Sequence, residues 1–164
     1  MPVTSDIARA WVRPRRVMAE RLAEGRHEDR AFAFLMVACG LIWVAQWPRL
    51  SREAFLTDAE LQPLMGGALM AWLLIAPLLL YAVAALSRVV ARMLGGRGTW
   101  YGARLALFWS LLAVAPAWLL HGLTAGFIGP GPALSLVGLI VLAAFGWIWV
   151  NSLVVAERGQ GETA

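Results

Sequence analysis

Lysine is absent from this chain of 164 residues, and cysteine occurs only once. Cys39, alone inside an apolar run, cannot form an internal disulfide and lacks the clustered partners of a zinc or iron–sulfur site. Charged residues make up only 15% of the chain, against about 25% in soluble domains, whereas 60% of the residues are hydrophobic. These shortages argue against a water-soluble enzyme and against a redox scaffold. The length fits one domain.

Four long apolar runs make up most of the sequence. A helix needs roughly 17–25 apolar residues to cross a hydrocarbon core of about 30 Å. We therefore expect an all-α membrane bundle of four transmembrane helices, at 31–47, 64–86, 103–127 and 133–155. The bundle is expected to follow an N-terminal segment, 1–30, and to precede a tail, 156–164. The polar start of the chain does not resemble a cleaved signal peptide.

Prolines lie at the ends and in the middle of these runs. We expect the first helix to stop at Pro48, because the ring removes a backbone donor. Pro77 lies within the second run, where we expect a kink or an accommodation by neighbouring helices. Pro116 lies near the middle of the third run. A turn of alternating glycine and proline, 129–132, separates the third run from the fourth.

The placement of arginine predicts the orientation. Seven of the fourteen arginines precede the first run, four lie at 87–104, and Arg158 lies in the tail. The connection 48–63 has two arginines against three acidic residues, and 128–132 has no charge. Positive residues near the ends of spans favour the cytoplasmic side. Twelve arginines against two therefore predict a multi-pass membrane protein with both termini in the cytoplasm.

The N-terminal segment contains amphipathic stretches. Ile7, Ala10 and Trp11 share one helical face, and Pro14 either ends that helix or begins a second one. Apolar residues on one side and arginines on the other predict a helix in the membrane interface. The alternative is a solvated arm that only orients the first span. Three arginines of this segment are candidate contacts for anionic lipid headgroups or for a partner protein: Arg13, Arg15 and Arg16.

A second arginine-rich stretch follows the second run. Residues 87–94 are expected to extend that helix, with Gly95 as its stop. Gly96 and Gly98 bend the chain, Thr99 can cap the next helix, and Trp100 suits the membrane boundary. The alternative role of the stretch is topology control alone. Its arginines are further candidate contacts for anionic lipid or for a partner: Arg88, Arg92, Arg97 and Arg104.

No constellation of residues points to catalysis. The acidic residues all lie outside the predicted spans, and no nucleophile–base pair, metal-ligand cluster or phosphate-binding glycine loop has the required spacing. We expect no cofactor, no metal and no enzymatic activity. Because the arginines flank apolar runs, we expect no nucleic-acid binding either.

Small residues in the third run predict close helix packing. Gly122 and Gly126 form a GxxxG pair, which lets two backbones approach within the bundle or against another protein. His121 precedes the pair and is expected near the outer boundary as a hydrogen-bonded interfacial residue.

The run Gly95-Gly96-Arg97-Gly98-Thr99-Trp100, which leads into an apolar helix with Pro116 in its middle, resembles the hairpin of the Yip-type family. Eukaryotic members of that family are Rab GTPase-interacting membrane proteins. The resemblance implies an all-helical bundle of several spans with a cytoplasmic N-terminus, and for eukaryotic members a role in vesicle trafficking. It implies no catalytic residue. Five spans are usual in the family, whereas this chain has room for four.

Two functions of different classes follow from the sequence. The first is a non-enzymatic accessory or organising subunit of Yip type, which binds other integral membrane proteins or copies of itself, and anionic lipids. The alternative is a small transporter or lipid-handling protein, with a path lined by Gln46 and His121 between helices bent at Pro77 and Pro116.

Overall fold

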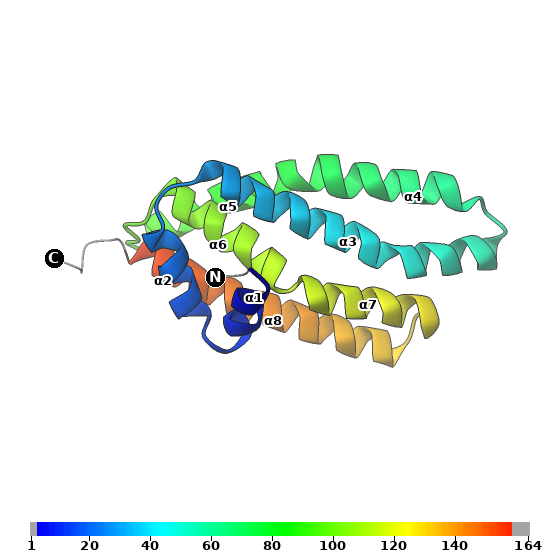
Figure 1. Ribbon diagram of the computed structural model, residues 1–164. Coiled ribbons are helices and arrows are strands. Elements are labelled where there is room, and N and C mark those ends of the chain that lie inside the picture. Colours follow the sequence, from blue (N-terminus) through cyan, green and yellow to red (C-terminus); the bar gives the residue numbers. More distant parts are fainter. Residues whose placement is uncertain (1–2, 159–164) are drawn as a thin grey trace.

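The computed structural model describes residues 3–158, and every regular element within them is a helix (Figure 1). In chain order the elements are α1 (Val3–Val12), α2 (Pro14–Ala23), α3 (Glu28–Thr57), α4 (Leu61–Met70), the π-helical turn η1 (Ala71–Ile75), α5 (Ala76–Met93), α6 (Trp100–Ala113), α7 (Ala115–Phe127) and α8 (Pro132–Glu157). The last residues of the predicted tail, 159–164, lie outside the described residues.

Three helical stretches are long and apolar enough to cross a membrane: α3, the continuous stretch Leu61–Met93, and α8. The bent pair of α6 and α7 makes a fourth if it counts as one span. The all-α fold and its candidate spans are thus confirmed. The loops at 24–27 and 94–99 lie at one end of the bundle with the end of α8, and the loops at 58–60 and 128–131 lie at the other (Figure 1). We call these the arginine end and the far end.

Pro77 is accommodated without a break in the second span. It lies in the first turn of α5, directly after the π-helical turn η1. Proline lacks a backbone donor, and its ring crowds the carbonyl four residues earlier, here that of Leu73 in η1. A wider π turn at this point relieves the crowding while the helix continues. The predicted extension of this span also holds, because α5 ends at Met93 and Gly95 follows with φ of 90°.

The first long helix does not stop at Pro48, which corrects the prediction from the sequence. α3 continues through the proline to Thr57. On this extension, Arg52 donates hydrogen bonds to the backbone carbonyls of Gly126 and Phe127, at 3.3 and 3.5 Å. A cation favours the negative end of a helix dipole. The C-terminal end of α7 therefore holds the extension of α3 in place.

The third apolar run forms two helices, which corrects the prediction of one. α6 and α7 meet at Val114 with a bend of 46°. Pro116 lies in the first turn of α7, where a missing N–H is tolerated. The N–H of Ala117 bonds the carbonyl of Val114 at 2.9 Å and so leaves the carbonyl of Ala113 free of the helical ladder. The indole N–H of Trp11 donates to that carbonyl at 2.9 Å.

α6 is the centre of the bundle and packs against α3, α5 and α8. Its side chains are buried from Tyr101 to the end of the helix, apart from Arg104. Phe108 and Trp109 are fully buried, and they meet the rings of Tyr81 and Phe34 edge to face, at 5.0 and 5.3 Å between centroids. A helix that is apolar on all sides needs neighbours all round, and this one has them.

The glycine pair of the third run is used inside the bundle. A Cβ on Gly122 would overlap the backbone carbonyl of Ala45, and a Cβ on Gly126 would overlap Pro48. Both glycines thus let α7 lie directly against the backbone of α3, the most extensive helix contact in the described residues. The sequence left open whether Gly122 and Gly126 pack within the bundle or against another protein. They pack against α3 of the same chain.

This packing predicts a position-specific effect of added methyl groups. Gly122→Ala is expected to lower the free energy of unfolding by about 1–3 kcal/mol, because the backbone of α3 has to move away. The matched control is Gly40→Ala in α3, where an added Cβ meets nothing within 4 Å and the change favours the helix. Thermal unfolding of the two variants in mild detergent measures both effects. Equal stability of the two variants would contradict the close contact between the backbones of α7 and α3.

Candidate functional site

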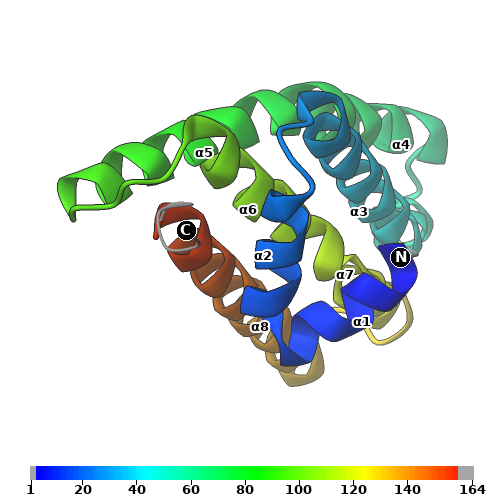
Figure 2. The ribbon, with the colours of Figure 1, turned by 60° about the vertical axis from the view of Figure 1, so that its left-hand side comes forward.

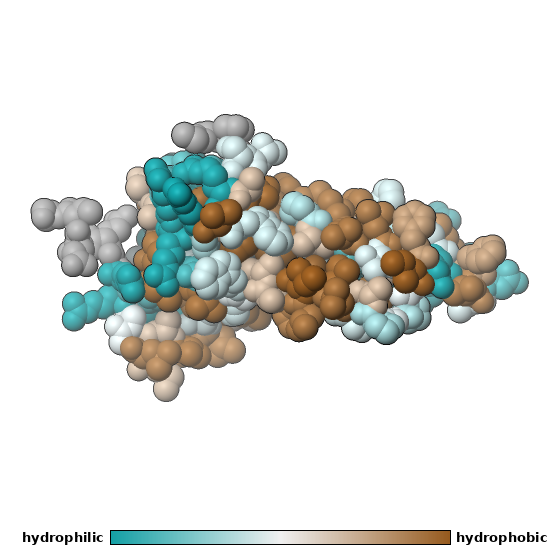
Figure 3. Space-filling view, turned by 90° about the horizontal axis from the view of Figure 1, so that it is seen from below, coloured by the Kyte–Doolittle hydropathy of each residue, from teal (hydrophilic) through white to brown (hydrophobic). Residues whose placement is uncertain are grey.

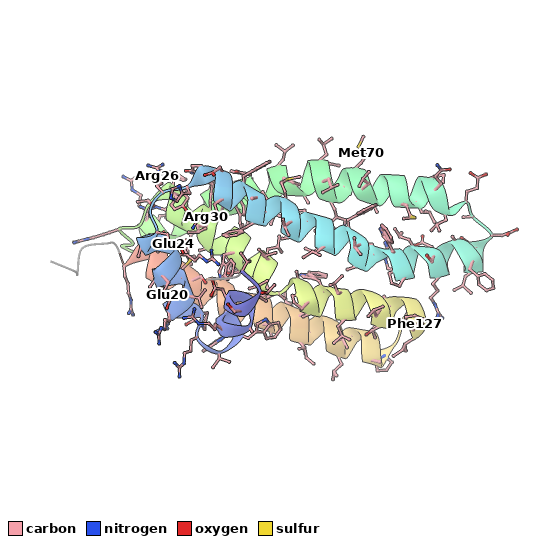
Figure 4. All side chains as sticks on the ribbon, in the orientation of Figure 1. Glu20, Glu24, Arg26, Arg30, Met70 and Phe127 are labelled. Carbon is pink, nitrogen blue, oxygen red and sulfur yellow. The ribbon has the colours of Figure 1, made fainter. Side chains whose placement is uncertain are left out.

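Hydrophilic residues gather mainly at the arginine end, with fewer at the far end, and the surface between the two ends is mostly apolar (Figure 3). Glu20, Glu24, Arg26 and Arg30 lie together at the arginine end, whereas Met70 and Phe127 project from the apolar remainder (Figure 4). Glu24 forms an ion pair with Arg30. Charges avoid hydrocarbon unless they are paired, so the arginine end is the place where this chain can meet charged partners.

Glu157, at the last turn of α8, joins three segments at this end. Its carboxylate forms an ion pair of 3.1 Å with Arg88 of α5, and the two side chains are only 10% and 11% exposed. The backbone N–H of Gly98 donates to the same carboxylate at 3.0 Å, and the N–H of Arg97 donates to the backbone carbonyl of Glu157 at 3.0 Å. One carboxylate thus fixes α5, α8 and the turn that precedes α6.

The glycines of that turn are needed for close approach to α8. A Cβ on Gly96 would overlap the carboxylate of Glu157, and a Cβ on Gly98 would overlap the backbone carbonyl of Ala156. Thr99 then caps α6 by accepting a hydrogen bond of 3.0 Å from the N–H of Gly102, as the sequence predicted. The family-like turn is therefore a structural joint around the end of α8.

Arg21 and Asp6 form a second buried pair. Their side chains meet at 2.6 Å and are 7% and 9% exposed. The guanidinium of Arg21 lies over the ring of Trp109 at 4.6 Å and over that of Phe34 at 5.2 Å. A cation is stabilised on aromatic faces. The pair thus attaches α1 and α2 to each other and to the core formed by α3 and α6.

The apolar faces of the N-terminal segment pack on protein. The segment forms two helices that meet at Pro14, and α2 lies on α8. Ala10 and Met18 are fully buried. This differs from the prediction of faces turned toward lipid, because α1 contacts α6 and α8, and α2 contacts α8. Arg15 strengthens the attachment with a hydrogen bond of 2.7 Å to Asn151 of α8.

A charged network holds α1 to α2 at the surface. Arg9 donates to Glu20 at 2.9 Å, and Arg16 donates to the same carboxylate at 3.0 Å. These hydrogen bonds, that of Arg9 first, lower the pKa of Glu20, and Glu20 in turn raises the pKa of Arg9. Glu20 therefore stays ionised to lower pH than a free glutamate, and Arg9 stays protonated to higher pH than a free arginine.

The candidate arginines divide into engaged and free ones. Arg88 is held by Glu157, Arg15 by Asn151, Arg16 by Glu20 and Arg104 by Glu28. Three others are exposed and form no ion pair within residues 3–158: Arg13, Arg92 and Arg97. The free members are thus distributed over two places, the α1–α2 junction and the region where α5 ends.

A lateral cleft separates α5 from α8. α5 packs on α6 and barely touches α8 in the described part of the chain, and Figure 2 shows the two helices apart. The cleft contains two hollows, one after the other along the helices. The hollow near the arginine end has a volume of about 690 Å³ and includes Arg97 and Arg158 in its lining. The second hollow lies farther from the arginine end, and we call it the deeper hollow. It has a volume of about 450 Å³ and is lined by apolar side chains and His121.

His121 lies half-buried beside this deeper hollow, with its ring 5.8 Å from that of Trp118. Gln46, the other residue predicted to line a path, belongs to α3 and bonds Arg49 at 3.1 Å. It does not line the hollow with His121. Within the described residues, no three histidine, cysteine or acidic side chains are grouped in a way that could hold a metal ion.

Sequence reasoning missed the two carboxylates that organise this end. Glu157 lies in the predicted tail and Asp6 in the predicted N-terminal segment, and neither is among the candidate residues. The available signal was position: each acidic residue lies beside an apolar stretch, where a charge needs a cationic partner. The partners themselves, Arg88 and Arg21, are 69 and 15 residues away in sequence and could not be paired without the fold.

Comparisons with protein families, with curated proteins and with solved structures found no match. The resemblance to the Yip-type family stays a prediction from the glycine-rich turn and the helix that follows it.

The contacts of Glu157 predict that a single substitution of this residue strongly lowers the stability of the protein. Glu157→Gln leaves Arg88 buried without a counter-charge, and we expect it to lower the free energy of unfolding by about 2–4 kcal/mol. Glu53→Gln removes the exposed partner of Arg49 and is expected to cost under about 1 kcal/mol. Thermal unfolding in detergent compares the two. A Glu157 variant as stable as the Glu53 variant would show that the joint contributes nothing.

Proposed function

We propose that this chain is a non-enzymatic accessory protein of the bacterial inner membrane, which binds an integral membrane partner through its exposed helix faces and anionic lipid at its arginine end. The observation that carries the proposal is the uncovered surface of two spans. In the most apolar windows of Leu61–Met93 and of α8, only 11% of the residues are buried, against 39% in α3. These two spans therefore offer most of their surface to lipid or to another protein.

The use of the polar side chains supports the same interpretation. Asp6, Arg21, Arg88 and Glu157 are buried or nearly so and bind one another across helices. The two pairs join α1 to α2 and α5 to α8, and the exposed cations beside them at the arginine end suit docking to acidic surfaces. By the placement of arginine, this end faces the cytoplasm with both chain termini.

The alternative function, a small transporter or lipid-handling protein, is favoured by the lateral cleft between α5 and α8. The deeper hollow is lined by aliphatic and aromatic side chains, with His121 as its main polar neighbour. Such a lining suits acyl chains, whereas a path for a polar solute needs several convergent polar groups. The cleft thus favours lipid handling over solute transport.

In-cell photo-crosslinking tests the accessory role directly. A photoreactive phenylalanine analogue replaces Leu78 of α5 or Leu139 of α8, which are 70% and 66% exposed. A discrete protein adduct, with another membrane protein or with a second copy, is expected from at least one of these sites. The control is Phe55, an exposed residue near the end of α3 at the far end. Lipid adducts alone at both test positions would contradict the accessory role.

A further inference from the structure

The cleft between α5 and α8 is lined by matching stripes of the two helices. On α8 the lining residues recur at helical spacing, from Gly138 at one end to Arg158 at the other. On the facing side they run from Trp72 in η1 along α5 to Leu94, the residue that follows α5. Most are aliphatic, and several remain exposed within the molecule, among them Leu79, Leu86 and Leu142. The two stripes thus form an open-sided apolar slot along the bundle.

Positive charge lies at one end of this slot only. Arg97 and Arg158 line the hollow at the arginine end and form no ion pair within residues 3–158. Glu157 also lines that hollow, but its carboxylate is neutralised by Arg88 and by the N–H of Gly98. Within residues 3–158, the end of the slot therefore carries a net positive charge, and its two unpaired guanidinium groups form no ion pair there.

The dimensions of the charged hollow match one leaflet of a bilayer. Along α8, its lining extends from Trp149 to Arg158, which is about 14 Å at 1.5 Å per residue. Half of a hydrocarbon core of about 30 Å is about 15 Å. The deeper hollow continues along the same helices toward the far end, past Leu80 and Phe145. A chain that begins at the arginines thus has apolar contacts to the middle of the membrane and beyond.

We propose that this slot binds one anionic diacyl glycerophospholipid from the leaflet at the arginine end. Its phosphate lies between Arg97 and Arg158, where guanidinium groups donate in a geometry that suits phosphate. Its acyl chains lie along Val90, Val83 and Leu153 and enter the deeper hollow. This inference rests on the proposed function, which it deepens by naming the lipid class and its place.

A transmembrane helix of a second copy fits the slot less well. Close helix pairs need small residues in the seam, and the glycine pair of this chain is already used between α7 and α3. The slot presents mainly large aliphatic side chains. A helix seated there would also cover Arg97 and Arg158 without supplying a phosphate. A lipid from the opposite leaflet would find only His121 at that end, and this ring already contacts Trp118.

Native mass spectrometry of the full chain tests the site. The protein is released from mixed micelles that contain equal amounts of phosphatidylglycerol and phosphatidylethanolamine, and the retained lipids are counted. We expect one retained phosphatidylglycerol. The double variant Arg97→Gln and Arg158→Gln should reduce its retention about tenfold or more, since each surface arginine contributes about 1 kcal/mol toward an anionic lipid. Arg49→Gln, an exposed arginine at the far end that lines neither hollow, should retain it as the unchanged chain does.

A second pair of variants tests the acyl part with both arginines intact. Val90→Trp places a large ring at the rim of the slot and should displace the lipid. Leu139→Trp places the same ring on α8 at a position that lines neither hollow and should not. Millimolar glycerol 3-phosphate, which has the headgroup chemistry without chains, should fail to displace phosphatidylglycerol. Displacement by it would reduce the site to one for small phosphates and overturn the proposal.

Two further outcomes would also overturn the lipid site. One is equal retention of both lipids by the unchanged chain, or retention of phosphatidylglycerol by the double variant that equals that of the unchanged chain. The other is a dimer that the Val90 variant abolishes, because it would identify a second copy as the occupant. The crosslinks at Leu78 and Leu139 do not depend on the bound lipid. Adducts without lipid retention would remove only this inference, and lipid retention without adducts would remove only the accessory role.

Discussion

Hydrocarbon offers neither hydrogen-bond partners nor counter-ions, and this constraint accounts for where most charged groups within residues 3–158 lie. The backbone satisfies itself in helices, and the charged side chains gather at the two ends of the bundle. Where a charge does enter the packed region, it is matched: Arg21 with Asp6, and Arg88 with Glu157. Removing Glu157 would leave the charge of Arg88 buried without a counter-ion, whereas Asp6 also forms an ion pair of 3.1 Å with Arg9. The arrangement of helices at the arginine end follows from these two matches.

The break between α6 and α7 depends on the same rule. Pro116 prevents one continuous helix, and the carbonyl that the break frees at Ala113 would be costly without a donor. Trp11 supplies that donor, and the segment that carries it is attached by Arg21 and Arg15. The bend between α6 and α7 is therefore stabilised by α1, which lies outside the bundle. The bend also lets α7 lie along α3, where Gly122 and Gly126 permit contact of the two backbones.

Local chemistry in the sequence predicted much of this fold, and long-range pairing remained beyond it. Apolar runs predicted the candidate spans, Gly95 the end of α5, and Thr99 the cap of α6, because each depends on residues close in sequence. The helix through Pro48 was not predictable, since its support comes from α7. The sequence made Arg88 a candidate contact for lipid or for a partner protein, because Glu157, with which it pairs, lies on another helix. The cleft exists because α5 packs on α6 and barely touches α8. No pattern of neighbouring residues in the sequence predicts this.

Cysteine labelling tests most directly whether the chain crosses the membrane with its arginine end inside. In a Cys39→Ala background, single cysteines replace Arg26, Glu60 or Arg158, and intact cells are treated with a membrane-impermeant maleimide. The account predicts labelling of the Glu60 position in intact cells, and labelling of the Arg26 and Arg158 positions only after the membrane is opened. Opposite accessibility of positions 26 and 158, or purification of the folded chain without detergent, would contradict it.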